Sequence, residues 1–137
     1  MRGIPSRSIR AVALAALALV AACGDAPTAP GLQPQITNLT DSFSYQVTSI
    51  QGFTGTYTYN WQNTGTLARI SHSSNSGATG TANLVVRDAA GTQVYSGALV
   101  SSGQPMSAPA GVAGTWTVNV VYSNYSNTQV NFGVLMQ

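Results

Sequence analysis

Hydrophobic and polar residues alternate along most of the chain after residue 37. The pattern begins in DSFSYQVTS (41–49), where Phe43, Tyr45 and Val47 are separated by small polar residues. Successive side chains of a strand point to opposite faces, so this alternation predicts a strand with one buried face. The same pattern returns in later segments, at 56–62, 67–72, 81–88, 92–100, 115–122 and 129–136.

Turn-forming residues separate these segments. They include DAAG (88–91), the long loop 101–114 and SNYSNT (123–128), which we expect to be a hairpin loop between the last two strands. No helical window exceeds one turn. The pattern therefore predicts an all-β domain: an antiparallel β-sandwich of jelly-roll or immunoglobulin-like type with seven or eight strands. A closed barrel is the alternative.

One aromatic stripe allows two interpretations. Tyr57, Tyr59 and Trp61 share one face of their strand, and such a row on a sheet surface can stack on sugar rings. The opposite face carries Thr, Asn and Gln, and burying that face would leave hydroxyl and amide groups without water. We therefore expect the stripe to belong to the core.

The first 22 residues have the form of a signal peptide. A short basic segment (1–10) precedes twelve apolar residues (11–22), fewer than the roughly 20 that a membrane-spanning helix needs. Val20-Ala21-Ala22-Cys23 resembles the lipobox of bacterial lipoproteins. The resemblance implies that Cys23, the single cysteine of the chain, carries a lipid and becomes the first residue of the mature protein.

The segment after Cys23 is rich in Pro and Gly and has almost no large apolar side chain. It is typical of an extended tether. The expected organisation is a lipoprotein signal peptide at 1–22, a flexible tether at 23–36 and the β-sandwich domain at 37–137.

Charge argues against one class of partner. Charged residues make up 6% of the chain, and three of its five arginines precede residue 11. The part after Cys23 carries two arginines against three aspartates, a formal charge of −1. Nucleic-acid binding depends on neutralising phosphates, so we exclude a nucleic-acid partner.

A second resemblance concerns the C-terminal half. LVVRDAAGTQVYSG, AGTWTVNV and VNFGV, within residues 84–134, resemble jelly-roll-like modules of the prepeptidase C-terminal and P-domain type, which accompany secreted bacterial proteases. Those modules are non-catalytic, and the resemblance implies the same here.

Residues that could support catalysis are few. His72 lies between serines and is expected to be an exposed loop histidine, while Asp41 and Asp88 are expected to be turn residues. No Gly-x-Ser-x-Gly motif is present, and there are too few ligands for a zinc site. We expect no enzyme activity, no cofactor and no metal; a hydrolase is the distant alternative.

The sequence thus predicts a lipid-anchored protein of the bacterial cell envelope with a non-catalytic binding or structural role. The alternative is a carbohydrate-binding module that uses exposed aromatic residues. Binding residues concentrate in loops, so the candidate ligand contacts are Tyr125, Phe53 and Asn124. The expected partners are the membrane, through Cys23, and a glycan or envelope protein. Gly24 follows the cysteine where the inner-membrane retention signal of enteric bacteria has aspartate, which favours the outer membrane.

Overall fold

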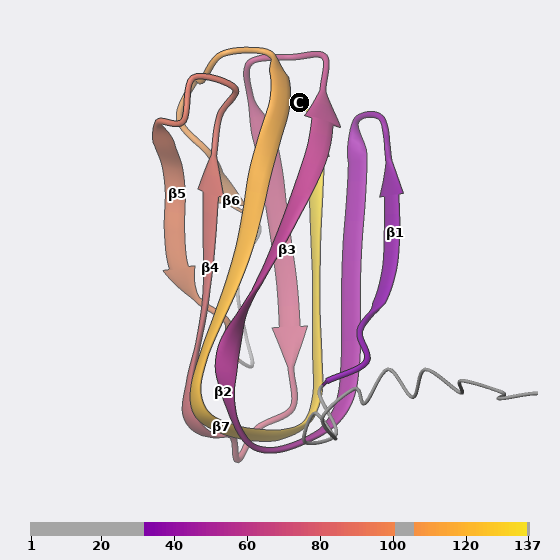
Figure 1. Cartoon of the computed structure of the whole chain (residues 1–137), viewed down its shortest axis with the longest axis vertical. Helices are drawn as coiled ribbons and strands as arrows, with labels where there is room; N and C mark the ends of the chain where they lie inside the picture. The colour runs from indigo at the N-terminus through magenta and orange to yellow at the C-terminus, as the bar shows by residue number, and fades with distance from the viewer. Residues whose placement is uncertain (1–31, 101–105, 137) are drawn as a thin grey trace, which may run out of the picture.

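The structure is a computed structural model that describes residues 32–100 and 106–136. These residues form an all-β, antiparallel fold, which confirms the all-β and antiparallel part of the prediction (Figure 1). Its strands are β1 (Gln35–Leu39), β2 (Ser42–Asn63), β3 (Ala68–Ser74), β4 (Thr79–Arg87), β5 (Gln93–Ala98), β6 (Met106–Ser107) and β7 (Gly114–Met136). Within the described ranges, no helix is long and apolar enough to cross a membrane.

Two long strands organise the fold. β2 and β7 pair with each other along nearly their whole length, and both turn back at the lower end of the molecule in Figure 1. Their two halves therefore lie in two facing layers. The first layer has the order β1-β2-β7-β3-β6, and in the second β4 pairs with the other half of β7 and with β5. We call the lower end, where both strands turn, the bend end.

Backbone conformation explains the bend. Ser49, Gly52 and Asn124 have positive φ, at 57°, 55° and 44°, and they interrupt the extended backbone of β2 and β7 at matching heights. The register between the two strands shifts between Ile50 and Phe53 and again before Gly55. Irregularities of this kind increase local twist and bend a strand. The bend is therefore built into both strands at once.

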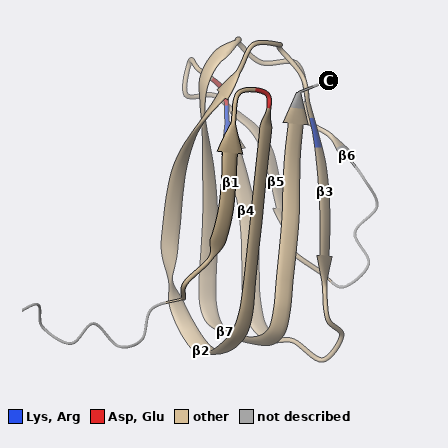
Figure 2. Cartoon of the chain, turned by 90° about the vertical axis from the view of Figure 1, so that its right-hand side faces the viewer, with Lys and Arg blue, Asp and Glu red and all other residues tan. Residues whose placement is uncertain are grey.

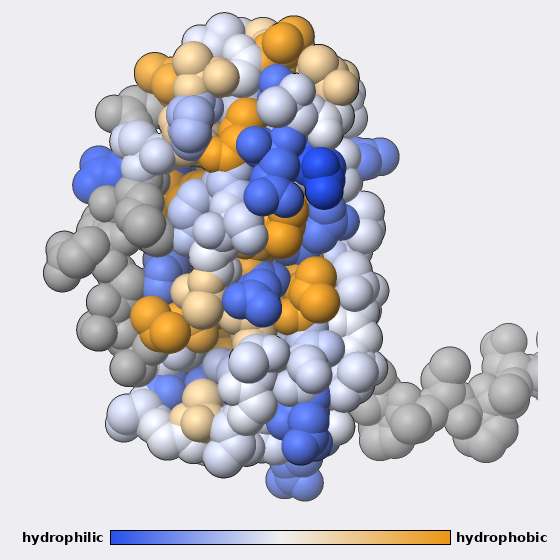
Figure 3. Space-filling view, turned by 90° about the vertical axis from the view of Figure 1, so that its left-hand side faces the viewer, coloured by the Kyte–Doolittle hydropathy of each residue, from blue (hydrophilic) through white to orange (hydrophobic). Residues whose placement is uncertain are grey.

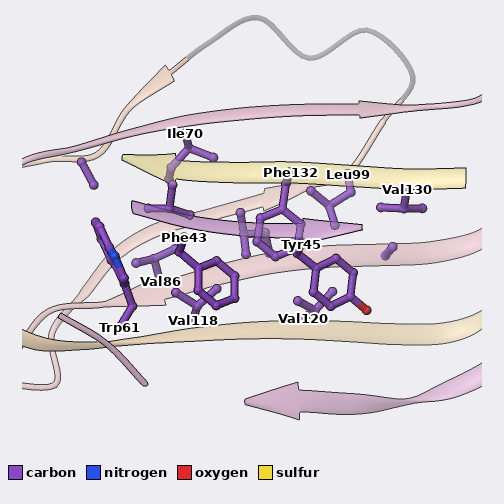
Figure 4. Packing of buried hydrophobic residues seen from close by; sticks show 14 of the residues in the cluster. Phe43, Tyr45, Trp61, Ile70, Val86, Leu99, Val118, Val120, Val130 and Phe132 are labelled. Carbon is purple, nitrogen blue, oxygen red and sulfur yellow. The ribbon is translucent and has the colours of Figure 1, made fainter. Parts of the chain in front are cut away.

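The core lies between the two layers, as Figure 4 shows. Phe43 of the first layer packs on Tyr59 of the second with ring centroids 5.5 Å apart, and Tyr45 lies 6.1 Å from the same ring. Trp61 and Trp116 are fully buried and meet edge to face. The inward faces predicted for β3, β4 and β7 are also confirmed by their buried residues: Ala68, Ile70, Ala82, Leu84, Val86, Trp116, Val118, Val120, Tyr122, Val130, Phe132 and Val134.

The prediction of a hairpin loop at 123–128 is wrong. These residues continue β7, where Tyr125 pairs with Phe53 and Ser126 pairs with Thr79. The two halves of β7 pair with the two halves of β2 rather than with each other, so the chain bends between layers instead of reversing within one. β6 likewise falls inside the segment 101–114 that was expected to be a loop.

The folded part also begins earlier than the expected boundary at residue 37. Gln35 and Ile36 are the first residues of β1, and Ile36 and Leu32 pack against the core. The carbonyl oxygen of Leu32 accepts a hydrogen bond of 2.9 Å from the Tyr57 hydroxyl. The last residues of the predicted tether are therefore part of the fold.

Both aspartates of the described chain serve turns, as predicted. Asp41 accepts hydrogen bonds from the backbone N–H and the hydroxyl of Thr64, each 2.7 Å long, which joins two turns at the end opposite the bend. The buried Asp88 carboxylate accepts three backbone N–H groups, from Ala90, Thr92 and Val112. These bonds use the carboxylates to hold turns and loops together.

Candidate binding site at the bend end

Two hollows flank the loop that joins β3 to β4. The first has a volume of about 350 Å³ and is lined by Ser74, Asn75, Ser76, Gly77, Ala78, Gly80, Thr81, Ala82, Ala98, Leu99, Val100 and Tyr125. The second, of about 370 Å³, is lined by Ser49, Ile50, Gln51, Ser76, Gly77, Thr79, Ser126, Asn127 and Thr128. Ser76 and Gly77 belong to both linings and separate the hollows.

The first hollow combines an apolar wall with polar, uncharged groups. Ala82, Leu99 and Tyr125 supply buried apolar surface, and Ser74 and Asn75 supply hydroxyl and amide groups. Its volume is at the lower end of the range of small-molecule sites, which are mostly apolar with a few placed polar groups. Such an arrangement can hold a small neutral ligand by contact and hydrogen bonding.

A network of amides and hydroxyls fixes the loop over the bend. The Asn75 amide donates to the Thr128 hydroxyl, and the Asn75 backbone N–H donates to the Gln129 carbonyl. The Asn127 amide, which is 8% exposed, donates to the Asn75 carbonyl at 3.2 Å and to the Tyr125 hydroxyl at 2.9 Å. The loop is thus tied to β7, so the hollows beside it are largely preformed.

One polar atom beside the first hollow is left without a partner. The Ser74 hydroxyl oxygen is buried and has no hydrogen-bond partner among the described residues. A buried hydroxyl without a partner costs roughly 1–3 kcal/mol. A ligand group in the hollow that met this hydroxyl would recover part of that cost.

Tyr125 was predicted to be an exposed loop aromatic, and this placement is wrong. Its side chain is 2% exposed and faces the core, where its ring lies 5.5 Å from that of Tyr122. The surrounding Ser and Asn residues resemble a loop in sequence, but pairing with Phe53 makes this part of β7 a strand. Tyr125 still lines the first hollow, although its ring offers no free face for stacking.

Phe53 and Asn124 also lie at the bend rather than in loops. Phe53 is a half-buried residue of β2 whose ring stacks on Tyr57 at 5.8 Å and meets the edge of Tyr122 at 5.6 Å. Asn124 is exposed, and its backbone N–H donates to the Thr54 hydroxyl at 2.8 Å. The structure therefore brings the three predicted contacts together, mainly through the packing of the bend.

The aromatic stripe of β2 is buried only in part. Trp61 is fully buried, as predicted, and its indole N–H donates to the Leu39 carbonyl. Tyr57 and Tyr59 are half-buried, and their rings stack with centroids 6.4 Å apart. Burial raises the pKa of Tyr59 above its ordinary value. The stripe thus packs against the core along its length, with partial exposure toward the bend.

A pair of tyrosine hydroxyls lies between the layers. The Tyr45 and Tyr122 hydroxyl oxygens are 2.9 Å apart and buried. Burial raises the pKa of both phenols above their ordinary value of 10.0. Both groups therefore stay neutral at physiological pH and act as a hydrogen-bonded link between the two layers.

His72 was predicted to be an exposed loop histidine, and this is also wrong. It is an inward-facing residue of β3, 8% exposed, paired with Phe132. Its Nδ1 lies 3.2 Å from the Val100 carbonyl oxygen, an arrangement in which Nδ1–H donates. His72 is hydrogen-bonded to the Val100 backbone, whereas Asp41 and Asp88 accept hydrogen bonds from turn and loop residues. None of these hydrogen bonds joins His72 to an aspartate, as a catalytic dyad would require.

In the part of the chain that the structure describes, no three His, Cys, Asp or Glu side chains gather into a metal site. Cys23 and the lipobox lie outside the described residues, so lipidation stays a prediction. Comparison with protein-family models, curated proteins and solved structures finds no match for this chain. The resemblance to prepeptidase C-terminal and P-domain modules also stays a prediction.

Sequence reasoning missed Leu99 and Asn127 as contributors to the site. The hollow forms where the end of β5, the β3–β4 loop and the bend of β7 meet, and these segments are distant in sequence. One local signal was present in the sequence: the two-residue spacing of apolar and aromatic residues slips between Tyr122 and Tyr125 and again between Tyr125 and Val130. Two such slips are typical of bulges when a strand continues through them.

Proposed function

We propose that the protein is a lipid-anchored component of the bacterial cell envelope with a non-catalytic binding role. The anchor is the lipid on Cys23, and the binding site is the first hollow at the bend end. The observation that carries the binding role is this hollow, which has no charged residue in its lining and combines an apolar wall with hydroxyl and amide groups, among them the Ser74 hydroxyl, unpaired within the described chain.

The lining favours a neutral, hydroxyl-rich ligand such as a glycan. Charged ligands require compensating charges when they lose water, and the lining offers none. Sugars present apolar C–H faces beside hydroxyls, and the lining offers both apolar residues, Leu99 and Ala82, and polar ones such as Ser74. The buried ring of Tyr125 contributes wall rather than a stacking platform.

We further propose that the two layers form an open β-sandwich of jelly-roll or immunoglobulin-like type rather than a closed barrel. Support comes from the contacts between inward faces, such as Phe43 with Tyr59. β5 and β1 each pair with one strand only, which leaves edges between the layers in the described chain.

Metabolic labelling tests the anchor. Bacteria that express the full chain with labelled palmitate should incorporate label into the wild type and into a Gly24→Ala control, but not into Cys23→Ala. Equal labelling of wild type and Cys23→Ala, or none in either, would refute the anchor.

A glycan screen with two matched variants tests the binding site. Ala98 lines the first hollow, and Ser96 is exposed two residues earlier on the same strand, outside both linings. We expect Ala98→Trp to abolish binding of envelope glycans and peptidoglycan fragments, and Ser96→Trp to leave it unchanged. Binding that survives both changes excludes the hollow, and no binding by the wild type excludes the glycan.

A further inference from the structure

We propose that the bend end is the surface that faces and contacts the membrane carrying the lipid on Cys23. The occupant of this surface is the layer of lipid head groups, held by neutral hydrogen bonding rather than by charge. This inference rests on the proposed lipid anchor and adds an orientation to it, because it places the two hollows toward the bilayer.

The first observation is where the chain enters the fold. Leu32 is held at the bend end by the hydrogen bond from the Tyr57 hydroxyl, and Tyr57 lies two residues after the register shift at Gly55. From there β1 runs toward the opposite end, where the β1–β2 turn lies, and the C-terminus lies at that end as well (Figure 1). The described chain therefore enters the fold at the bend end.

The second observation is the length of chain between anchor and fold. Cys23 and Leu32 are nine residues apart, which spans at most about 30 Å when fully extended. The first half of β2, from Ser42 to Ile50, is about 26 Å long at the usual rise per residue. The domain could place its opposite end on the bilayer only with this segment close to fully extended, so the bend end is favoured.

The third observation is the distribution of charge. The charged residues of the described chain are Asp41, Arg69, Arg87 and Asp88, and all four lie toward the end opposite the bend (Figure 2). The linings of both hollows are uncharged. In Figure 3 the surface near the bend is mostly white and blue, with hydrophobic residues scattered elsewhere. Such a surface suits hydrogen bonding to head groups and carries no charge to repel an anionic bilayer.

A depth measurement with the processed, lipidated full chain tests the orientation. Two variants, Ser76→Cys at the bend end and Ala90→Cys in the turn after β4, each add one exposed thiol for a fluorescent dye. Lipidation occupies the sulfur of Cys23, so each variant takes one dye. The chains are bound to phosphatidylcholine vesicles that contain a lipid with a nitroxide on its head group.

We expect the dye at position 76 to be quenched several-fold more than the dye at position 90. Raising the salt from about 0.1 M to about 1 M shortens the screening length from about 10 Å to about 3 Å and should leave this difference unchanged. Equal quenching at both positions, stronger quenching at position 90, or loss of the difference in salt would overturn the inference. If the unsubstituted chain itself reacts with the dye, Cys23 is free and the anchor proposal fails as well.

Discussion

The backbone of β7 at its bend lies directly against Gly80, and replacing this glycine by alanine is the sharpest test of the architecture. Gly80 has a φ of +74°, a backbone conformation that strongly favours glycine. A Cβ at this position would lie 2.2 Å from the carbonyl oxygen of Asn124 and 2.5 Å from that of Ser123. Both obstacles are backbone atoms of β7 at its bend, so no side-chain rotation relieves the contact.

The expected loss of stability has two parts. Left-handed backbone costs an alanine about 1–2 kcal/mol. To clear the carbonyls, β4 must also move away from β7, and this disturbs the pairing of Thr79 with Ser126 and of Thr81 with Ser123. Loss of two hydrogen bonds adds about 1–3 kcal/mol, so we expect Gly80→Ala to lower the free energy of unfolding by about 2–5 kcal/mol.

Gly77→Ala is the matched control. Gly77 is three residues earlier, has a φ of +89°, and a Cβ there would meet nothing within 4 Å. Gly77→Ala carries the same free-energy cost of left-handed backbone and the same reduction of unfolded-state entropy as Gly80→Ala, but its Cβ does not collide with other atoms. The difference between the two variants therefore isolates the contact between β4 and the bend of β7.

Urea unfolding of residues 24–137, monitored by tryptophan fluorescence, measures both losses. The two tryptophans are buried and report on the core. With a shared m-value, the shift in the midpoint converts directly into a free-energy difference. If Gly80→Ala and Gly77→Ala lose the same stability, the close approach at Gly80 does not exist and our account of the bend is wrong.

Three other predictions use the same assay or a titration. Trp116→Ala should lower the free energy of unfolding by about 3–5 kcal/mol because its indole is fully buried; a loss below about 1 kcal/mol would contradict that burial. Asp88→Asn should lower the free energy of unfolding by about 1–3 kcal/mol because the new amide NH₂ would face a backbone N–H. Asp41→Asn should lower it less, because the second partner of Asp41 is the Thr64 hydroxyl, which can accept a hydrogen bond from the new NH₂ instead of donating one. Equal losses for the two variants would contradict this reasoning. Burial raises the pKa of the Tyr45 and Tyr122 phenols, so the unfolded chain releases protons first and stability should fall as pH rises above about 10; phenol absorbance that rises well before unfolding would contradict their burial.

The sequence predicts the inward faces well because they depend on local alternation. Val118 and Val120, or Phe43 and Tyr45, alternate with small polar residues, and their burial follows from the two-residue period of a strand. The turn at Asp88 is equally local, since its carboxylate bonds backbone groups two and four residues ahead.

The bend could not be predicted in this way. Residues 123–128 contain Ser, Asn and Thr, which form turns, and the alternation slips where they begin. Whether such a segment reverses the chain or continues a strand depends on its partner, here the corresponding part of β2. The errors at Tyr125 and Phe53 both follow from this non-local pairing, and His72 was misplaced because its serine neighbours resemble a loop.

The path of β1 also determines how the fold bears mechanical load. The described chain enters at the bend end and leaves at the opposite end, so a pull on its termini acts along the long axis (Figure 1). Hydrogen bonds of an antiparallel pair run perpendicular to the strands. Tension on Gln35 therefore loads the bonds between β1 and β2 in shear, all at once, and tension on the last residues of β7 does the same against β2 and β3. A pull along this axis must break all the hydrogen bonds between two paired strands together. A pull on β1 perpendicular to the axis would instead break its hydrogen bonds to β2 one after another.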